Sequence, residues 1–194
     1  MRLAVYGGSF DPPHVAHVLV AAYTLAVGEF DRLLVIPVFA HAFDKRLTPF
    51  EDRVAMCRLA FADLSRVEVS PIESRLGAPS RTLTTLEALK AEHPDAELGL
   101  VIGSDVLSAK DKWYRFDDVC RLAPPFVVGR SGHEHAGAFV GVTLPDISST
   151  HVRALFASRT ESAERELRRL VPGRVLEYAR ARRLYESMRA APES

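Results

Sequence analysis

Short apolar runs alternate along the chain with longer segments in which apolar residues recur at helical spacing. The short runs predict strands at residues 2–6, 33–36, 67–69, 98–102, 126–128 and 142–144. The longer segments predict helices at residues 15–27, 49–63 and 82–93, with further helices from residue 149 onward. Strands that alternate with helices are typical of an α/β fold, so we expect a doubly wound, Rossmann-like parallel sheet with crossover helices and a C-terminal helical segment.

Turn and capping residues mark the ends of several expected elements. Thr48, Pro49 and Glu51 have the spacing of a helix start, with Thr48 as the N-cap, Pro49 at the first helical position and Glu51 completing a capping box. Polar residues with Pro and Gly predict a loop at residues 74–80, and a Gly- and His-rich stretch predicts another at residues 129–141. These signals divide the chain into the alternating elements of a parallel sheet.

Length and composition limit the class of protein. The 194 residues, 47% of them apolar, predict one domain over residues 1–194, in which residues 149–188 are the C-terminal helical part. Lys and Arg number 25, as do Asp and Glu, and this balance disfavours nucleic acid as a partner. Cys57 and Cys120 are too few and too far apart for a disulfide framework or a zinc knuckle.

The apolar stretches are short. The longest, residues 15–27, falls below the ~20 residues that a membrane span requires, and the first residues do not have the pattern of a signal peptide. We therefore expect a cytoplasmic protein with no membrane partner. The sequence does not indicate an oligomeric state.

Polar residues cluster in three places where a predicted strand ends or a predicted helix begins: residues 7–17, 103–105 and 147–153. In a doubly wound sheet, ligands bind beyond the carboxyl ends of the strands, where loops from different strands converge. The three segments are therefore candidates for one site.

The first of these segments has residues suited to phosphate. Gly7 and Gly8 allow backbone N–H groups to approach a phosphate, and the helix that follows offers N–H donors at its start. His14 and His17 lie three positions apart, so both rings can donate to one polyphosphate. A Gly-Gly turn is also ordinary after a first strand, and such a His pair can hold a metal or cap a helix. No third metal ligand lies nearby in the sequence, so no metal site is expected.

The three segments read Gly7-Gly8-Ser9-Phe10-Asp11-Pro12-Pro13-His14-Val15-Ala16-His17, then Gly103-Ser104-Asp105 followed by Trp113-Tyr114-Arg115, then Ile147-Ser148-Ser149-Thr150-His151-Val152-Arg153. The first resembles the phosphate-binding signature of the nucleotidylyltransferase superfamily. The last resembles its second signature, a Ser/Ser/Thr turn that opens a helix with an arginine one turn in. The middle is similar to that of bacterial nicotinate-nucleotide adenylyltransferases. Order and spacing hold from Met1 to Tyr185, nearly the whole chain.

The resemblance implies transfer of the adenylyl group of ATP to nicotinate mononucleotide, which gives nicotinate adenine dinucleotide (NaAD, deamido-NAD) and pyrophosphate in NAD biosynthesis, with Mg²⁺ bound with ATP. It implies as catalytic residues His14, His17 and Arg153. It assigns ATP binding to Gly7, Gly8, Ser9, Phe10, His14, His17, Gly103, Ser104, Asp105, Ser149, Thr150 and Arg153. It assigns mononucleotide binding to Lys45, Thr82, Trp113 and Tyr114.

Several of these residues also have an ordinary structural role. Ser149 and Thr150 can cap the helix that they open, and Asp105 can cap the helix that follows it. Trp113 can stack on a pyridine ring or pack on its own loop. Lys45 can reach a phosphate or remain a solvated loop charge. The sequence leaves these alternatives open.

Two positions depart from the family's pattern. Ala16 replaces the glycine that is usual between the two histidines, which adds a methyl group beside the nucleotide. Arg81 stands where tyrosine is usual, in the acceptor region, so it bears on the acceptor rather than on the reaction. Nicotinamide mononucleotide and phosphopantetheine are the alternative acceptors, although His14 argues against the phosphopantetheine branch, which usually lacks that histidine. A nucleotide-binding or hydrolytic protein on the same fold is the third alternative.

Overall fold

The computed structural model describes residues 1–40, 47–104, 106, 113–130, 143–145, 147–158 and 160–186. Their centre is a parallel sheet in the order β3-β2-β1-β4-β5-β6. The strands are β1 (Arg2–Gly8), β2 (Arg32–Pro37), β3 (Val67–Val69), β4 (Glu97–Gly103), β5 (Pro125–Arg130) and β6 (Thr143–Leu144). The order runs outward from β1 in both directions, so the predicted doubly wound parallel sheet is confirmed.

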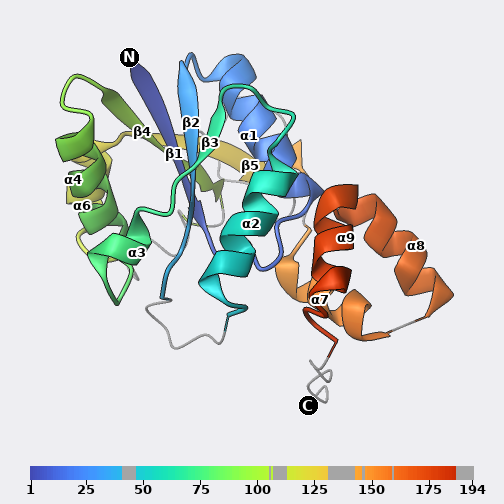
Figure 1. Ribbon diagram of the computed structural model, residues 1–194. Coiled ribbons are helices and arrows are strands. Elements are labelled where there is room, and N and C mark those ends of the chain that lie inside the picture. The colour runs from blue at the N-terminus through green and yellow to red at the C-terminus, as the bar shows by residue number, and fades with distance from the viewer. Residues whose placement is uncertain are drawn as a thin grey trace.

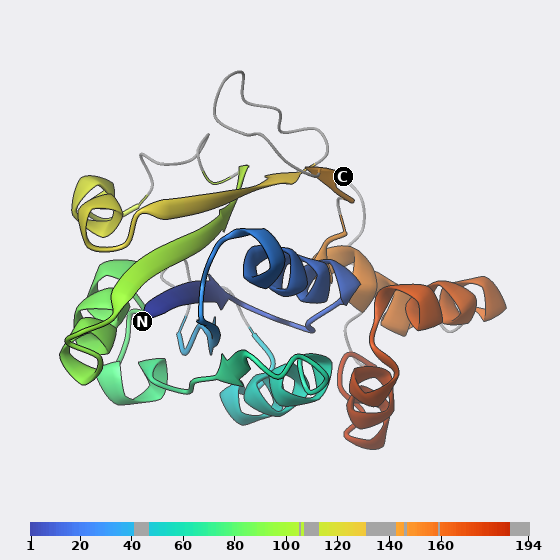
Figure 2. The same ribbon diagram turned by 90° about the horizontal axis from the view of Figure 1, so that it is seen from above.

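Helices cover both faces of this sheet (Figure 1). They are α1 (Val15–Val27), α2 (Phe50–Ala60), α3 (Glu73–Leu76), α4 (Thr82–Glu92), α6 (Phe116–Leu122), α7 (Ser149–Ser158), α8 (Glu161–Leu170) and α9 (Gly173–Ala181). Seen from above, α4 and α6 lie on one side of the sheet and α1 and α2 on the other, with α7, α8 and α9 beyond them (Figure 2).

Alternation along the strands explains why both faces are covered. In β1, Leu3 and Val5 belong to one buried cluster, which contains residues of α4 and α6, whereas Ala4 belongs to a second cluster with residues of α1 and α2. Successive strand residues point to opposite faces, so a strand that is apolar at every position needs cover on both. The central strand β2 has the same character, with burial over all residues after Arg32.

The C-terminal helices form a third cluster together with α2. Met56 of α2 is buried among residues of α7, α8 and α9, including Val152, Leu167 and Val175. Polar contacts support this packing, because the buried carboxylate of Asp52 accepts hydrogen bonds from Tyr178 Oη at 2.8 Å and Arg182 Nε at 3.2 Å. The C-terminal helical segment is thus confirmed, while the single domain over residues 1–194 stays a prediction.

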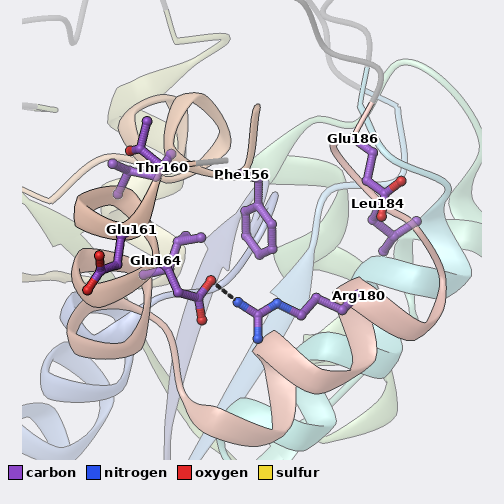
Figure 3. Close-up of a pocket in the computed structure, with 9 residues that line it drawn as sticks. Phe156, Thr160, Glu161, Glu164, Arg180, Leu184 and Glu186 are labelled. Atoms are coloured by element: carbon purple, nitrogen blue, oxygen red, sulfur yellow. Dashed lines mark hydrogen bonds and ion pairs between the residues drawn. The ribbon is translucent and has the colours of Figure 1, made fainter. Parts of the chain in front are cut away.

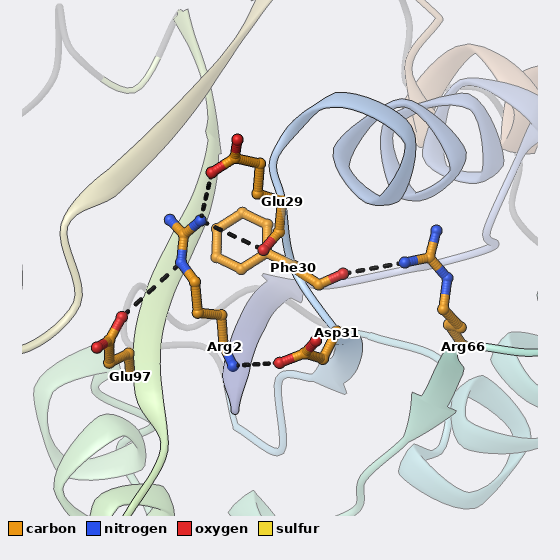
Figure 4. A network of polar contacts seen from close by, with 6 residues as sticks. All are labelled: Arg2, Glu29, Phe30, Asp31, Arg66 and Glu97. Atoms are coloured by element: carbon orange, nitrogen blue, oxygen red, sulfur yellow. Dashed lines mark hydrogen bonds and ion pairs between the residues drawn. The ribbon is translucent and has the colours of Figure 1, made fainter.

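At the amino end of the sheet, charged side chains tie the strands and the loop before β2 together (Figure 4). The Arg2 guanidinium lies 3.1 Å from the Glu29 carboxylate and 3.8 Å from that of Glu97, and the Arg2 backbone N–H donates to Asp31. These contacts hold the end of the sheet opposite to the one where Gly7-Gly8 closes β1. The polar segments of the candidate site lie at the carboxyl end.

The structure differs from the sequence prediction at several element boundaries. The short helix α3 (Glu73–Leu76) takes up residues 74–76 of the expected loop, and α6 was not expected. The helix α2 ends at Ala60 rather than near residue 63. Thr48 does not cap α2 through its side chain: its carbonyl accepts from Arg53 Nε at 2.9 Å, so Thr48 belongs to the preceding turn. Within the described residues, none of the helices is long and apolar enough to cross a membrane.

Candidate active site

At the carboxyl end of the sheet β1 and β4 separate. Their pairing ends at Val5 and Leu100. Beyond that point β1 continues beside β2 as far as Gly8, and β4 continues beside β5 as far as Gly103. This is the place where the strand order reverses, which is where doubly wound sheets bind ligands.

Gly7 lies in this opening. It is exposed although β1 is a central strand, and a Cβ atom added at Gly7 would meet no atom of the described residues within 4 Å, its chain neighbours aside. Gly8 differs, because its Cβ would lie 3.0 Å from the Phe10 ring. On the β4 side, Gly103 is half-buried and Ser104 is buried. The backbone of Gly7 is therefore open to a ligand, whereas Gly8 is small because Phe10 packs against it.

Phe10 fixes the turn that leads from β1 to α1. Its φ is 46° and its side chain is 1% exposed, with the ring 4.9 Å from that of His17 and 6.3 Å from that of Phe61. The left-handed conformation is uncommon for a bulky residue and is maintained here by burial of the ring. Phe10 thus offers a ligand its backbone only, and its side chain supports the loop from below.

The two histidines at the start of α1 lie together as the sequence predicts. Their ring centroids are 3.7 Å apart, His14 is buried and His17 is half-buried. The backbone N–H of His14 donates to Nδ1 of His17 at 3.1 Å. Because Nδ1 is then an acceptor, the proton of the neutral His17 ring is on Nε2. His17 is thereby oriented as an Nε2–H donor.

Helix α7 brings the second motif onto the first. Ser149 Oγ donates to the carbonyl of Pro12 at 3.0 Å, and Arg153 Nη1 donates to the carbonyl of Asp11 at 2.6 Å. The other terminal nitrogen of Arg153 lies 3.1 Å from Thr150 Oγ1. These contacts join segments separated by 137 and 142 positions. The two polar segments therefore lie in direct contact, as expected from their places at strand and helix ends, and that they form one site stays a prediction.

The cap of α7 is Ser148. Its Oγ accepts from the backbone N–H of His151 at 3.1 Å, which is the geometry of an N-cap. Capping therefore does not occupy the hydroxyls of Ser149 and Thr150, and Thr150 is exposed. The structure thus does not use these two side chains as caps. Ser149 contacts Pro12 and Thr150 contacts Arg153 instead.

Asp11 lies at the centre of a buried network that the sequence did not indicate. Its carboxylate accepts from Tyr185 Oη at 2.7 Å and from the backbone N–H of Thr48 at 3.2 Å. The nearby Arg53 is 1% exposed and donates to the carbonyls of Ser9 at 3.0 Å and Thr48 at 2.9 Å. Burial lowers the pKa of Arg53, and the charge of Asp11 opposes this. No local pattern marks Arg53 or Tyr185, because their partners are distant in sequence.

Residues expected at the acceptor meet at the start of α4. Thr82 is the first residue of that helix and is half-buried. The guanidinium carbon of the preceding Arg81 lies 4.1 Å from the ring centroid of Tyr114, which is 53% exposed. Trp113 packs partly against the core and edge-on to Phe116, at 5.7 Å. Arg81, the neighbour of Thr82, is thus in contact with Tyr114, whereas Trp113 packs toward the core. Lys45 and Asp105 lie outside the described residues.

Glu73 links this region to the end of β2. It is buried, and its carboxylate accepts from the Phe39 backbone N–H at 2.9 Å and from Thr85 Oγ1 at 3.0 Å. Ser80 and Ala40 add two hydrogen bonds of 3.1 Å between the same segments. Glu73 therefore fixes the chain that follows β2 against α4. A buried carboxylate with these partners is not visible in the sequence.

Comparisons with known proteins agree with this geometry. The model of the cytidylyltransferase-like family matches residues 5–155, which include both motifs. A probable nicotinate-nucleotide adenylyltransferase of Anaeromyxobacter dehalogenans (strain 2CP-C) is 47% identical over 187 residues, or 95% of this chain and 96% of the relative. The chain belongs to this family of adenylyltransferases. A second such relative, from Myxococcus xanthus (strain DK1622), is 38% identical over 186 residues and 95% of each chain.

The fold of this adenylyltransferase is also that of a solved structure. Plasmodium falciparum nicotinic acid mononucleotide adenylyltransferase complexed with NaAD superposes with a TM-score of 0.82 at 19% identity, covering 95% of this chain and 97% of that one. At this identity the likeness shows the fold, which includes the C-terminal helices. The Rossmann-like prediction is confirmed a second time, by shape.

The adenylyltransferase has another cavity of about 530 Å³, between α7, α8 and α9 (Figure 3). Phe156, Leu184 and the ion pair of Glu164 with Arg180 line it. Hydrogen bonding from Arg180 holds the pKa of Glu164 below its usual range. The residues around this cavity include none of the candidate site residues. The carboxyl end of β1 and β4, where α7 meets the loop after β1, therefore remains the candidate active site.

Proposed function

We propose that the chain transfers the adenylyl group of ATP to nicotinate mononucleotide and forms NaAD, a precursor of NAD, with release of pyrophosphate. One observation supports this most directly. Ser149 and Arg153 of the second motif donate to the carbonyls of Pro12 and Asp11, so the two motifs contact each other directly. The reaction is that of the probable nicotinate-nucleotide adenylyltransferases to which the chain is 38–47% identical.

The proposed reaction needs positioning and charge neutralisation more than covalent chemistry. A phosphate oxygen of the mononucleotide attacks the α-phosphorus of ATP. A new P–O bond forms as the bond between the α-phosphorus and the bridging oxygen breaks, and pyrophosphate leaves with the electron pair. The charge that develops on the bridging oxygen and the leaving group requires donors that are already oriented.

The site residues have orientations suited to these tasks. His17 presents Nε2–H because its Nδ1 is engaged, and Gly7 leaves room for a phosphate beside the backbone. The hydroxyls of Ser149 and Thr150 stand in the first turn of α7, a helix of ten residues whose N-terminus favours anions. We assign to Arg153 the neutralisation of the triphosphate charge, and to His14 and His17 hydrogen bonds to its oxygens.

Mg²⁺ is proposed to enter with ATP as part of the substrate. Within the described ranges, no three His, Cys, Asp or Glu side chains converge as a metal site would require. The side chains proposed to contact the triphosphate include the imidazoles of His14 and His17 and the guanidinium of Arg153, whereas Mg²⁺ prefers oxygen ligands such as those of the triphosphate itself. When bound, the metal supplies Lewis-acid charge stabilisation on the phosphate oxygens.

The acceptor is proposed to lie between the start of α4 and Tyr114. Thr82 begins α4, and Arg81 lies over the Tyr114 ring at the rim of the same region. Nicotinate mononucleotide differs from the amide by a carboxylate charge, so a cation at the rim favours the acid. Lys45 and Trp113 complete the proposed acceptor site.

We further propose a cytoplasmic location, because the reaction consumes ATP and both Cys57 and Cys120 are free thiols. Nucleic acid and membranes remain outside the proposed partners, which are ATP and nicotinate mononucleotide.

The test is pyrophosphate release from ATP and Mg²⁺, measured with and without nicotinate mononucleotide. The proposal requires that release depend on the mononucleotide and equal the NaAD formed. Release of phosphate or pyrophosphate at the same rate without an acceptor would identify a hydrolase instead. Phosphopantetheine as the third arm of the assay tests the remaining acceptor class.

A further inference from the structure

Tyr185 lies close to the candidate site although it follows the last helix, α9. Its side chain is 5% exposed, and its ring packs 5.3 Å from that of Phe156. The residue has a φ of 69°, and Arg183 two positions earlier has a φ of 53°. Such left-handed conformations are costly for large side chains and persist where the surroundings impose them. The turn after α9 thus directs Tyr185 inward.

The hydroxyl of Tyr185 ends on the phosphate-binding loop. It donates to Asp11 Oδ1 at 2.7 Å, across 174 positions of sequence. Burial raises the pKa of Tyr185 above its ordinary value, and the nearby Asp11 charge raises it further. The hydroxyl is therefore protonated at neutral pH and acts as a donor. Met56 Sδ, a weak acceptor, lies 4.0 Å from the hydroxyl, and the Thr48 side chain also hydrogen-bonds to it.

Asp11 connects this hydroxyl to Arg153. The Asp11 carboxylate is held by Tyr185 on one oxygen and by the Thr48 N–H on the other. The Asp11 carbonyl in turn accepts from Arg153 Nη1 at 2.6 Å. Asp11 thus accepts a hydrogen bond from Tyr185 through its carboxylate and one from Arg153 through its backbone carbonyl. A shift of the Asp11 backbone would therefore move the carbonyl that accepts from the Arg153 guanidinium.

We propose that Tyr185 is a positioning residue for adenylyl transfer, which acts through Asp11 to hold Arg153 in place at the ATP triphosphate. This inference rests on the proposed function. It assigns the C-terminal turn, which lies beyond residues 5–155 of the family match, a part in the chemistry. The hydroxyl does this work, because the ring alone accounts for the packing against Phe156.

Tyr178 offers a matched control. Its hydroxyl donates to Asp52 Oδ1 at 2.8 Å, so it is also a tyrosine of the C-terminal segment bound to a buried carboxylate. Asp52 lies on α2 and contacts Arg182, not the phosphate-binding loop. Removal of either hydroxyl leaves a buried carboxylate with one donor fewer, but only Tyr185 reaches Asp11.

The experiment compares Tyr185→Phe with Tyr178→Phe in the full chain. The inference predicts that Tyr185→Phe lowers kcat/KM for ATP by about tenfold or more and weakens ATP binding measured by calorimetry without acceptor by about fivefold. Tyr178→Phe is expected to stay within about twofold of the wild type on both measures. The melting temperatures of the two variants should agree within about 3 °C.

A double-variant series tests the route through Arg153. In an Arg153→Ala background, Tyr185→Phe is expected to lower kcat/KM by less than about twofold, because the group that it positions is already absent. A full additional loss there would overturn the inference. So would equal activities of the two Phe variants, or a melting temperature of Tyr185→Phe more than about 10 °C below its control, which would assign the hydroxyl to stability.

Failure of the proposed function is separately visible. The wild type would then show no turnover that depends on nicotinate mononucleotide. ATP binding by the same three proteins still decides the positioning inference, since that measurement needs no acceptor.

Discussion

Substitution of the two adjacent glycines by alanine separates a functional position from a structural one. At Gly7 a methyl group would meet no atom within 4 Å in the described part of the chain, its neighbours in sequence aside, whereas at Gly8 it would lie 3.0–3.4 Å from three atoms of the Phe10 ring. Neither glycine has a positive φ, so alanine is compatible with the backbone at both. The two variants add the same atoms to neighbouring residues and differ only in what those atoms meet.

The magnitudes follow from these surroundings. Gly7→Ala leaves stability unchanged or raises it by up to about 1 kcal/mol, because alanine reduces the entropy of the unfolded chain. The methyl group occupies the space in which a phosphate is proposed to approach the backbone, so kcat/KM for ATP should fall about tenfold or more, or ~1.4 kcal/mol. Gly8→Ala forces the 1%-exposed Phe10 ring to move. Overpacking of this kind costs about 1–3 kcal/mol of stability.

Thermal unfolding and steady-state kinetics with varied ATP measure the two effects on the same proteins. For a chain of this size, each kcal/mol corresponds to a shift in melting temperature of about 2–4 °C. Gly7→Ala should lose activity with no fall in melting temperature, and Gly8→Ala should lower the melting temperature. Wild-type kinetics in Gly7→Ala would refute the proposal that ATP binds beside Gly7 at the end of β1.

Further predictions concern individual side chains. His17→Ala should lower kcat by about tenfold or more with little change in melting temperature, because it removes the oriented Nε2–H donor, while the control His93→Ala stays within about twofold. Arg153→Ala should chiefly raise KM for ATP, and unchanged ATP saturation would remove α7 from the site. Burial raises the pKa of the Cys57 thiol more than that of the half-buried Cys120. Iodoacetamide should therefore modify Cys120 of the native protein before Cys57, as measured by peptide mapping. Faster labelling of Cys57 would contradict its burial.

Much of the fold could be predicted from local pattern. The helix at residues 15–27 and the strand at residues 67–69 were predicted with the bounds that the structure has, because apolar spacing and strand character are local properties. The prediction failed where tertiary contacts decide. Thr48 looks like an N-cap, but its backbone is held by Arg53 and Asp11, so it stays outside the helix. The unexpected α6 is short and packs against α4. Its seven residues are too few to show a helical pattern of apolar positions.

The candidate site was predictable as motifs and not as a network. The segments ending at His17 and Arg153 were identified as parts of one site because strand ends converge in this type of sheet. The contacts of Asp11 with Tyr185 join residues 174 positions apart, and no periodicity carries such a pairing. The placement of Arg81 over Tyr114 likewise depends on how α4 meets the chain before α6. The roles of all these residues stay predictions.

The proposed function is tested most directly by the choice of acceptor. The measurement compares kcat/KM for nicotinate mononucleotide with that for nicotinamide mononucleotide, at saturating ATP and Mg²⁺, with the dinucleotide products identified by mass. The account predicts NaAD as the product and a preference for the acid of about tenfold or more, ~1.4 kcal/mol, since Arg81 adds positive charge beside Tyr114, where the acceptor is proposed to bind. Equal efficiency with the two mononucleotides, or a preference for the amide, would contradict it.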